Sequence, residues 1–549
     1  MAQATRPRAL LRVLGAEALG AAMALALALA ALRHVLATDR VRLLWYDGDS
    51  VLLPLVERSL RLGQSFEWAM SPTLFFFPEI PVYLACAALT STPQQALALN
   101  GLLVVVAVYV LVRAVAAQVM PEAPRAVRVA VAVGALGVVT LLVLTESSGT
   151  ASSLELASLL LTTTYYYGAV LAMLGTAALA LRVVRTASLP VPRTSWVALA
   201  VTTLVAASST ASDPLYVPWS AAPVIVTVGL LALARRVPWR VVWGLGVALA
   251  GGSALGYLLR IPLAPFVSLD PSTYIHPGGA GTTLSYFAAL TDERAGAGLG
   301  EVELVLLLVL FLASLGGTVW AWRVRSSRTV LVASALGMVT VVAVSVGVVL
   351  AGSSTPRYLE PIVTAPLIGL VAVAELARTA IRRTRLHTAG RGLRLIAVAA
   401  TVALLAVGGA VAPSTVEAVV TASYAPASCL DRWVGGRGVV GVGQFWTVRP
   451  LAAYGDEGVR LLQVRDDFTT YPWLVDLAAY RDARPTYVVI GSQDVWTTPV
   501  QDALGDPSAI VHCPGYDIYD YAGTPGAATL RHDVVSTAQE FIEERGFGG

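Results

Sequence analysis

Long apolar runs recur along the chain, and they constrain its fold more than any other feature. Hydrophobic residues make up 56% of the 549 residues and charged residues 13%, and the mean hydropathy of +0.70 is unlike that of soluble proteins. A run of about 20 apolar residues can cross a bilayer as a helix. Such runs predict about eleven membrane-spanning helices, near residues 14–36, 97–117, 129–145, 155–181, 195–211, 216–234, 240–258, 301–322, 329–350, 361–377 and 394–412.

The first run resembles a signal peptide at first sight, because it follows Arg6, Arg8 and Arg12. It is longer than the apolar part of a signal peptide, and its flank from Arg33 to Arg40 lacks a small-residue cleavage site. We therefore predict an uncleaved membrane anchor.

Arginine clusters between the runs set the orientation, since cytoplasmic loops carry an excess of Lys and Arg. The orientation predicted for all later helices depends on whether the segment Leu74–Leu89 crosses the membrane. This segment is short and contains Pro78, Glu79 and Pro81. If it spanned the membrane, every later arginine cluster would face outward, whereas an interfacial position places them in the cytoplasm with the basic N-terminus. We predict the interfacial position, a cytoplasmic N-terminus and an extracytoplasmic C-terminus. The net charge of only +3 gives no reason to expect a nucleic-acid partner.

Two carboxylates follow the first helix in the stretch Trp45–Ser50, Trp-Tyr-Asp-Gly-Asp-Ser. Acidic side chains beside a bilayer are costly unless water, a partner or a reaction uses them. Asp47 and Asp49 are therefore the first candidates for a functional site. The alternative is that they cap the next helix and form a turn around Gly48.

The composition changes after Val411, where soluble-domain residues replace the apolar runs. We predict a transmembrane domain over 1–412, with an outer loop at 37–96, and an extracytoplasmic α/β domain over 413–549. Strands are expected at 439–442, 459–464, 487–490 and 509–512, and helices at 471–480 and 534–545. Cys429 and Cys513 both fall in this region, and either a disulfide between them or two free thiols fits the sequence.

The order of these features resembles the GT-C glycosyltransferases. An acidic motif opens a long outer loop, two amphipathic segments follow at Val51–Leu62 and Leu74–Leu89, and the next helix reads Ala96–Val115. Arg357-Tyr358-Leu359-Glu360-Pro361 is similar to the Arg-Tyr-x-x-Pro of many such proteins. The resemblance implies a multi-spanning enzyme that uses a polyprenyl-phosphate-linked sugar on the outer face of the membrane.

The sequence also departs from this family. Many relatives carry Asp-Glu or Glu-x-x in the first loop, where this chain has Asp47-Gly48-Asp49, so the identity of the base stays open. The C-terminal region has no motif of a known sugar-binding module, although its Trp433, Trp446, Trp473 and Trp496 suit either core packing or stacking on a glycan.

Glycosyl transfer with inversion needs a base that removes the proton of the acceptor hydroxyl, and a carboxylate suits this role. We expect Asp47 to be this base and Asp49 to orient the acceptor. Alternatively, both carboxylates and Asp213 hold a divalent cation, Mg²⁺ or Mn²⁺, through their oxygens.

The leaving phosphate of a lipid-linked donor needs a cation, and the guanidinium of arginine binds phosphate in a bidentate manner. Arg357 and its neighbour Tyr358 are the predicted phosphate-binding residues, with Arg260 as a second ligand. The alternatives for Arg357 are an ion pair with Glu360 or a side chain that reaches the interface.

Three further residues are candidates for acceptor or metal binding. Asp213 precedes Pro214 in an outer turn, Glu79 lies between two prolines, and His276 lies in a glycine-rich outer loop of about forty residues, longer than ordinary connections. Each also has a plain alternative: a turn residue, a helix-start carboxylate and a solvated side chain. Tyr165–Tyr167 is interpreted as part of an interfacial aromatic belt.

These observations predict a plasma-membrane glycosyltransferase with a polyprenyl-phosphate sugar donor and an extracytoplasmic cell-envelope glycan or lipid-linked acceptor. Two other classes stay open: a transporter or flippase of lipid-linked glycans, and a non-enzymatic envelope scaffold. A transporter favours charged residues near helix midpoints and an internal repeat, and a scaffold has no need of Asp47.

Overall fold

The computed structural model describes residues 5–187, 193–268, 275–383 and 389–547. Within these ranges ten helices are long and apolar enough to cross a membrane. They are α1 (Thr5–Ala37), α4 (Pro93–Val119), α5 (Arg125–Val143), α6 (Tyr167–Arg185), α7 (Arg193–Ser212), α9 (Trp239–Arg260), α11 (Gly300–Arg323), α12 (Arg328–Leu350), α14 (Pro366–Arg383) with the two short helices before it, and α15 (Ala389–Val420). The predicted polytopic helical fold with a small C-terminal sheet domain is confirmed.

Two predicted spans differ from the helices found. The run near 216–234 forms a shorter apolar helix that includes α8 (Ala222–Leu233). The run near 155–181 becomes helical only at Tyr167, because its first part is tied down by other hydrogen bonds. The Glu146 carboxylate accepts hydrogen bonds from the backbone N–H groups of Ala157 (2.6 Å) and Ser158 (2.8 Å), which favours a short 3₁₀ turn there.

Small residues let the helices approach closely. Gly252 and Gly256 of α9 face α7, and a Cβ atom at either position would lie 2.6 Å from the carbonyl oxygen of Thr203 or Ala207. This glycine pair, spaced four residues apart, therefore permits backbone contact between the two helices, as small residues commonly do in membranes.

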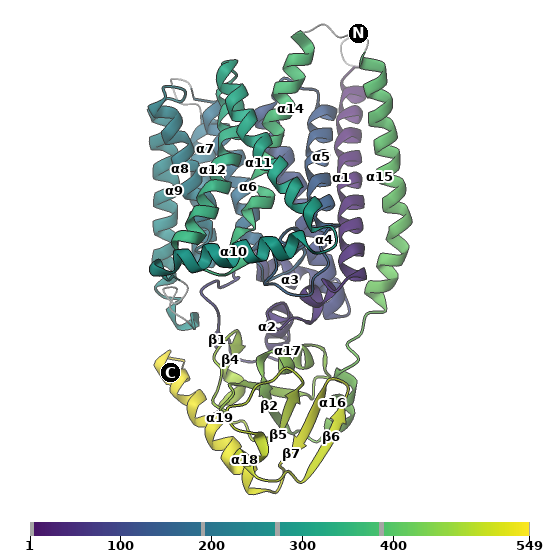
Figure 1. The fold of residues 1–549 in the computed structure, drawn as a ribbon, viewed down its shortest axis with the longest axis vertical. Helices are drawn as coiled ribbons and strands as arrows, with labels where there is room; N and C mark the ends of the chain where they lie inside the picture. The colour runs from purple at the N-terminus through teal and green to yellow at the C-terminus, as the bar shows by residue number, and fades with distance from the viewer. Residues whose placement is uncertain (1–4, 188–192, 269–274, 384–388, 548–549) are drawn as a thin grey trace.

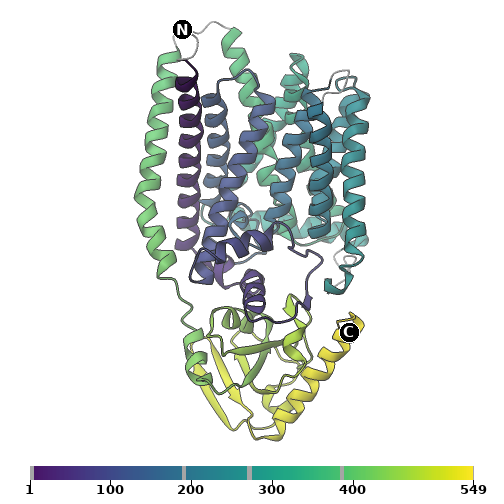
Figure 2. The same cartoon turned by 180° about the vertical axis from the view of Figure 1, so that it is seen from behind.

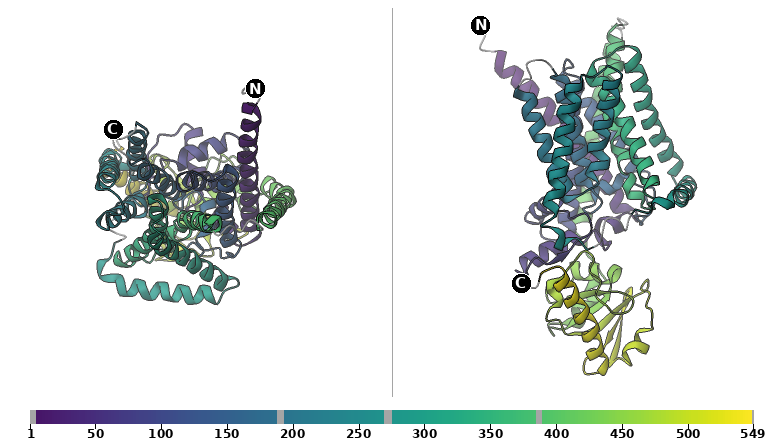
Figure 3. Two further views of the ribbon diagram at one scale, coloured as in Figure 1. Left: turned by 90° about the horizontal axis from the view of Figure 1, so that it is seen from above. Right: turned by 90° about the vertical axis from the view of Figure 1, so that its left-hand side faces the viewer.

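Short helices lie at the end of the bundle next to the C-terminal domain (Figure 1). They are α2 (Leu52–Arg61), α3 (Glu79–Ala87) and α10 (Ala280–Ala295). With nine residues, α3 rises only about 14 Å and is too short to cross a bilayer. Helix α10 runs across the bundle at this end, and Figure 3 shows it at the margin of the molecule.

The expected glycine-rich loop of about forty residues is therefore wrong in part, because α10 occupies its second half. Along this helix only Thr283 and Arg294 are buried, so apolar periodicity gives little signal. The Arg294 guanidinium instead anchors the end of α10 through ion pairs with Glu155 (2.8 Å) and Glu303 (2.6 Å).

The N-terminus and the C-terminal domain lie at opposite ends of the bundle (Figures 1 and 2). Helix α15 continues through Pro413 to Val420, so it ends eight residues beyond the predicted domain boundary at 412. The chain then enters the domain through α16 (Ala427–Val434).

The C-terminal domain is built on a five-stranded sheet in the order β3-β2-β5-β7-β6. Strands β3 and β5 pair parallel to β2, while β7 pairs antiparallel to β5 and β6. The strands are β2 (Val440–Gln444), β3 (Arg460–Val464), β5 (Pro485–Gly491), β6 (Ala509–Cys513) and β7 (Tyr516–Asp520), and the helices after α16 are α17 (Phe445–Tyr454), α18 (Val500–Leu504) and α19 (Pro525–Glu544). Four strands match the predicted positions.

The helix predicted at 471–480 is wrong. That segment contains β4 (Val475–Asp476), which pairs antiparallel with β1 (Trp68–Ala69). Strand β1 lies in the loop between α2 and α3. The Gln463 side-chain amide donates to the carbonyls of Tyr471 (2.7 Å) and Trp473 (2.6 Å). These carbonyls therefore accept hydrogen bonds from a side chain and not from the backbone N–H groups of a helix. The two-stranded pairing joins the domain to the bundle.

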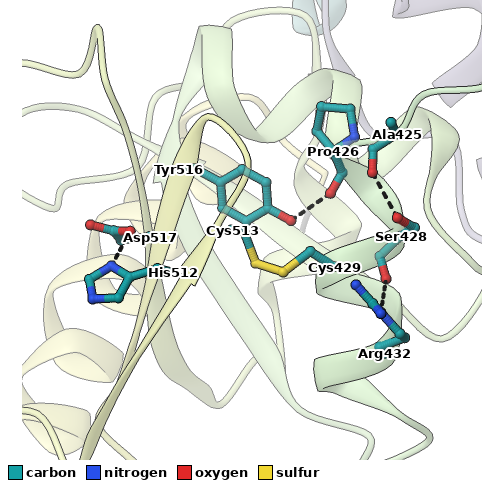
Figure 4. Close-up of a disulfide and its surroundings, with 9 residues drawn as sticks. All are labelled: Ala425, Pro426, Ser428, Cys429, Arg432, His512, Cys513, Tyr516 and Asp517. Carbon is teal, nitrogen blue, oxygen red and sulfur yellow. Dashed lines mark hydrogen bonds and ion pairs between the residues drawn. A yellow bond between two sulfur atoms is a disulfide. The ribbon is translucent and has the colours of Figure 1, made fainter.

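Cys429 of α16 and Cys513 of β6 form a disulfide with their Cα atoms 5.8 Å apart (Figure 4). Beside it, the Tyr516 hydroxyl donates to the carbonyl of Pro426 (2.8 Å). The first helix of the domain is thereby fixed to the edge strand of the sheet. Cys86 is a buried free thiol.

Candidate active site

The Asp47–Ser50 turn lies between a short π-helical turn, Arg42–Tyr46, and α2. The backbone N–H of Asp49 donates to Asp47 Oδ1 (3.0 Å), so Asp47 forms the expected turn around Gly48. Neither carboxylate caps α2, which has no side-chain cap. The turn leaves Asp47 and Asp49 as neighbouring carboxylates.

Gly48 is the point where the C-terminal domain touches this turn. A Cβ atom here would lie 2.6 Å from the Phe445 ring and 3.1 Å from the Trp446 ring, so a side chain does not fit. The Gly48 carbonyl accepts a hydrogen bond from Arg449 Nε (2.7 Å). Helix α17 therefore both packs on the turn and fixes its backbone.

Asp47 is half-buried and lies against Tyr165, whose hydroxyl donates to Asp47 Oδ1 (3.0 Å). Burial, and next the negative charge of Asp49, raise the pKa of Asp47 to about 7. A carboxylate that gains and loses its proton near neutral pH is suited to general base catalysis.

Asp49 forms an ion pair with Arg357, with 3.6 Å between Oδ2 and Nη1. The Arg357 guanidinium also lies 5.4 Å from the centre of the Tyr165 ring and 5.9 Å from that of Tyr166, within the range of cation–π attraction. The alternative pairing with Glu360 is not found: neither carboxylate oxygen of Glu360 has a hydrogen-bond partner among the described residues. Asp49 and Arg357 face each other instead.

A small cavity of about 40 Å³ adjoins this ion pair. It is lined from the bundle and from the C-terminal domain by Asp49, Ser71, Pro72, Thr73, Phe75, Thr164, Tyr166, Arg357, Tyr358, Trp473 and Leu474. Two predicted donor-phosphate residues, Arg357 and Tyr358, thus share one cavity with Asp49.

Asp213 lies behind this cavity. Its Oδ1 accepts hydrogen bonds from the Thr73 hydroxyl (3.3 Å) and from the backbone N–H of Leu215 (2.9 Å), while its Oδ2 has no partner. Burial raises the pKa of Asp213 to about 7. Through Thr73, Asp213 supports the cavity wall without lining the cavity.

Arg260 likewise acts on the wall. Its guanidinium donates to the carbonyls of Ala211 (2.9 Å) and Pro72 (2.6 Å), and it is not among the lining residues. These contacts fix the 71–73 segment.

Glu79 and His276 do not line the cavity either. Glu79 is buried, its Oε1 accepts the backbone N–H of Gly168 at the start of α6 (3.1 Å), and burial raises its pKa to about 8. His276 is exposed, and its backbone N–H donates to the carbonyl of Ala351 (2.7 Å). Glu79 therefore acts as a helix-start carboxylate, and His276 is a solvated side chain.

A shared metal site for Asp47, Asp49 and Asp213 is not found. Within the described parts of the chain, no three Asp, Glu, His or Cys side chains are grouped so that they could hold one ion. Any cation at this site therefore has only the Asp47–Asp49 pair as protein carboxylates, to which a substrate phosphate would have to add ligands.

Two residues of the site, Tyr165 and Arg449, were not predicted as such, whereas Trp473 was expected either to pack in the core or to stack on a glycan. Tyr165, assigned to an aromatic belt, is 1% exposed and donates to Asp47, so the belt interpretation is wrong for it. Arg449 and Trp473 come from the C-terminal domain. The only sequence signal for Arg449 is a lone charge in the apolar segment Phe445–Tyr454.

No protein-family model and no curated protein matches this chain. Among solved structures, the chain is similar to the Archaeoglobus fulgidus oligosaccharyltransferase in its apo form, with 12% identity and a TM-score of 0.43 over 94% of this chain and 72% of that chain. A structure of the same enzyme, tethered by a disulfide to an acceptor peptide with an NVT sequon, gives 11% identity and a TM-score of 0.41 over 94% and 71%.

Proposed function

We propose that this multi-pass membrane protein is a glycosyltransferase that moves a sugar from a polyprenyl-phosphate donor to a hydroxyl of an extracytoplasmic cell-envelope glycan or lipid-linked acceptor. One observation carries the proposal: Asp49 and Arg357 meet at a cavity, with Asp47 two residues from Asp49 in a turn that the C-terminal domain fixes. The reaction needs a base and a phosphate-binding cation, and here the proposed base lies two residues from the carboxylate that pairs with the cation.

In the proposed reaction the acceptor oxygen attacks C1 of the donor sugar as the bond from C1 to the phosphate oxygen breaks. Asp47 takes the proton of the acceptor hydroxyl, and its pKa of about 7 suits this transfer. The Tyr165 hydroxyl keeps the carboxylate in place by donating to Oδ1. The second carboxylate, Asp49, orients acceptor hydroxyls.

Arg357 stabilises the negative charge that remains on the departing lipid phosphate. Its side chain is 24% exposed and lines the cavity, so a phosphate in the cavity would lie next to it. Tyr358 lines the same cavity and supplies a hydroxyl donor. If Mg²⁺ or Mn²⁺ takes part, Asp47 and Asp49 hold it together with the phosphate.

The outer side of the plasma membrane is the proposed location of this site and of the C-terminal domain. The domain carries the Cys429–Cys513 disulfide, and disulfides persist in oxidising, extracytoplasmic compartments. The same orientation follows from the arginine clusters at the opposite end of the bundle.

A transfer assay tests the proposal. The full-length protein in lipid nanodiscs is given polyprenyl-phosphate-linked arabinose, mannose or glucose with octyl glycosides as acceptors. Asp47→Asn should lower kcat by about 10²–10⁴-fold, the usual contribution of a general base. The matched control is Asp482→Asn, an exposed acid of the C-terminal domain. Full activity of Asp47→Asn, or no transfer by the wild type from any donor, would count against a glycosyltransferase and in favour of a transporter or scaffold.

A further inference from the structure

A second cavity, of about 170 Å³, lies on the C-terminal domain and is separate from the cavity at Arg357. It opens where β2 and β5 end, between the start of α17, the segment after Gly491 and the β6–β7 turn. Its lining consists of Tyr424, Pro426, Trp446, Thr447, Leu451, Gly491, Ser492, Gln493, Pro514, Gly515 and Tyr516. The carboxyl ends of parallel strands are a frequent place for ligands in α/β sheets.

Trp446 connects this cavity to the Asp47–Ser50 turn. Its ring packs against Gly48, where a Cβ atom would be 3.1 Å from Trp446 Cε3, and it also lines the second cavity. The residue is nevertheless 57% exposed, although large aromatic residues are usually buried. A ligand stacked on this ring would therefore rest on a side chain that packs against the Asp47–Ser50 turn.

A second aromatic contact links the cavity to the residue just before this turn. The Tyr46 ring stacks on Tyr424 with 5.0 Å between ring centres, and Tyr424 lines the cavity. The hydroxyl of Tyr516, another lining residue, is fixed by its hydrogen bond to the Pro426 carbonyl. Three aromatic residues, Tyr424, Trp446 and Tyr516, thus line the cavity.

The chemistry of the lining selects the ligand. None of the lining residues is charged, so the cavity offers no cation for a phosphate, a carboxylate or a nucleotide. Aromatic faces suit the C–H faces of sugar rings, and the hydroxyl and amide groups of Thr447, Ser492 and Gln493 suit sugar hydroxyls. Asp494 holds this wall in shape, because its carboxylate accepts hydrogen bonds from Thr447 Oγ1 (2.7 Å) and Gly491 N (2.8 Å).

We propose that this cavity binds neutral sugar units of an oligosaccharide acceptor, with Trp446 as the stacking platform, while the terminal hydroxyl of the acceptor lies at Asp47. This inference rests on the proposed function and makes it more specific: the acceptor is a glycan of several units. A lipid alcohol or a single sugar would leave the cavity unused.

The test compares acceptors of different length. Octyl glycosides of one, two, three and four units in the arabinose, mannose and glucose series are given to the wild type, Trp446→Ala, Trp446→Phe and Ser492→Trp, which fills the cavity. The wild type should have a higher kcat/KM for longer acceptors. This preference should fall by about tenfold in Trp446→Ala and Ser492→Trp, because stacking on an aromatic ring is lost or blocked, and Trp446→Phe should retain most of it.

Gln501→Trp, an exposed position on α18 that does not line the cavity, is the control for Ser492→Trp. A wild type indifferent to acceptor length, or a Ser492→Trp variant with the full length preference, would overturn the subsite while leaving transfer at Asp47 intact. If no donor supports transfer, saturation-transfer NMR can test the subsite by comparing binding of the four-unit glycosides to the wild type and to Ser492→Trp. A signal that is lost only in Ser492→Trp supports the subsite. Equal signals in the two proteins, or no signal in either, overturn it.

Discussion

Two groups of charged residues lie at the same end of the bundle, and they differ in how completely their charges are matched. The first contains Arg40, Glu146, Glu155, Arg294 and Glu303, and it is called the buried ion network here. The second consists of Asp49 and Arg357, which line the small cavity, and of Asp47 in the same turn as Asp49. In the network every residue is at most 5% exposed. The side chains of Arg357 and Asp49 are 24% and 15% exposed.

Most polar side-chain atoms of the network also have hydrogen-bond partners. Arg40 donates to Ser158 Oγ (2.7 Å) and to the Glu155 carbonyl (2.7 Å), and Glu155 Oε2 accepts the backbone N–H groups of Ser147 and Ser148. Among the residues that the structure describes, no such set of donors surrounds Asp49, whose ion pair with Arg357 is long at 3.6 Å. A buried, matched group supports structure, and an accessible, loosely matched group is available for a substrate.

After Asp47→Asn, the largest effect on activity is expected for Arg357→Gln. Removing the cation that stabilises the departing phosphate should lower kcat by about 10²–10³-fold, as loss of one stabilising donor does in other enzymes. The melting temperature should change little, since the arginine is partly exposed. Kinetics and thermal unfolding on the same nanodisc preparation measure both. A variant with full activity would remove Arg357 from the reaction.

For Arg294→Gln, in the buried ion network, we expect a loss of stability and little loss of activity. Breaking a buried ion pair leaves Glu303 without its arginine partner and Glu155 with Arg40 alone, and it costs about 3–5 kcal/mol. The melting temperature should therefore fall clearly, while activity per folded molecule should stay close to that of the wild type. If instead stability is retained and activity is lost, the network belongs to the active site and the comparison fails.

A smaller effect is expected for Arg449→Gln, which removes the donor to the Gly48 carbonyl. The change should loosen the turn and lower kcat about tenfold, the equivalent of about 1.4 kcal/mol, with a smaller effect on donor KM. Arg449→Lys, which retains a charged donor, should recover part of the loss. Equal losses in the two variants would show that Arg449 acts by packing alone.

The smallest effect is a shift of the pH profile. Because a general base works in its deprotonated form, the proposed role of Asp47 predicts that kcat/KM rises as pH increases through about 7. The same raised pKa lowers stability over this range: the folded state holds a proton that the unfolded chain has released above about 4, so the contribution of Asp47 to stability falls as pH rises toward 7. Asp49→Asn removes a negative charge that raises this pKa, so the profile of its residual activity should move to lower pH. A shift to higher pH would exclude Asp47 as the titrating group.

The sequence was sufficient for the helical architecture, because crossing a bilayer imposes a length and an apolar composition that a run of residues displays directly. It also singled out Asp47, Asp49 and Arg357 as candidates, since charges beside apolar runs are conspicuous, and their role stays a prediction. Helix α10 was missed because an arginine with two carboxylate partners from other segments, and not an apolar stripe, holds its end in place.

The rest of the site depends on contacts between segments far apart in the chain. Arg449 reaches Gly48 across 401 residues, and Tyr165 reaches Asp47 across 118. No local pattern encodes such pairings. For the same reason Arg260 and Asp213, which looked like ligands in sequence, turned out to support the segment that lines the cavity.

The most direct measurement is an experimental structure of the protein in nanodiscs with decaprenyl phosphate bound. The account predicts that the lipid phosphate lies within hydrogen-bond distance of the Arg357 guanidinium, beside Asp49 and next to the Asp47 carboxylate. A phosphate bound at the opposite, arginine-rich end of the bundle, or one held without contact to Arg357, would contradict it.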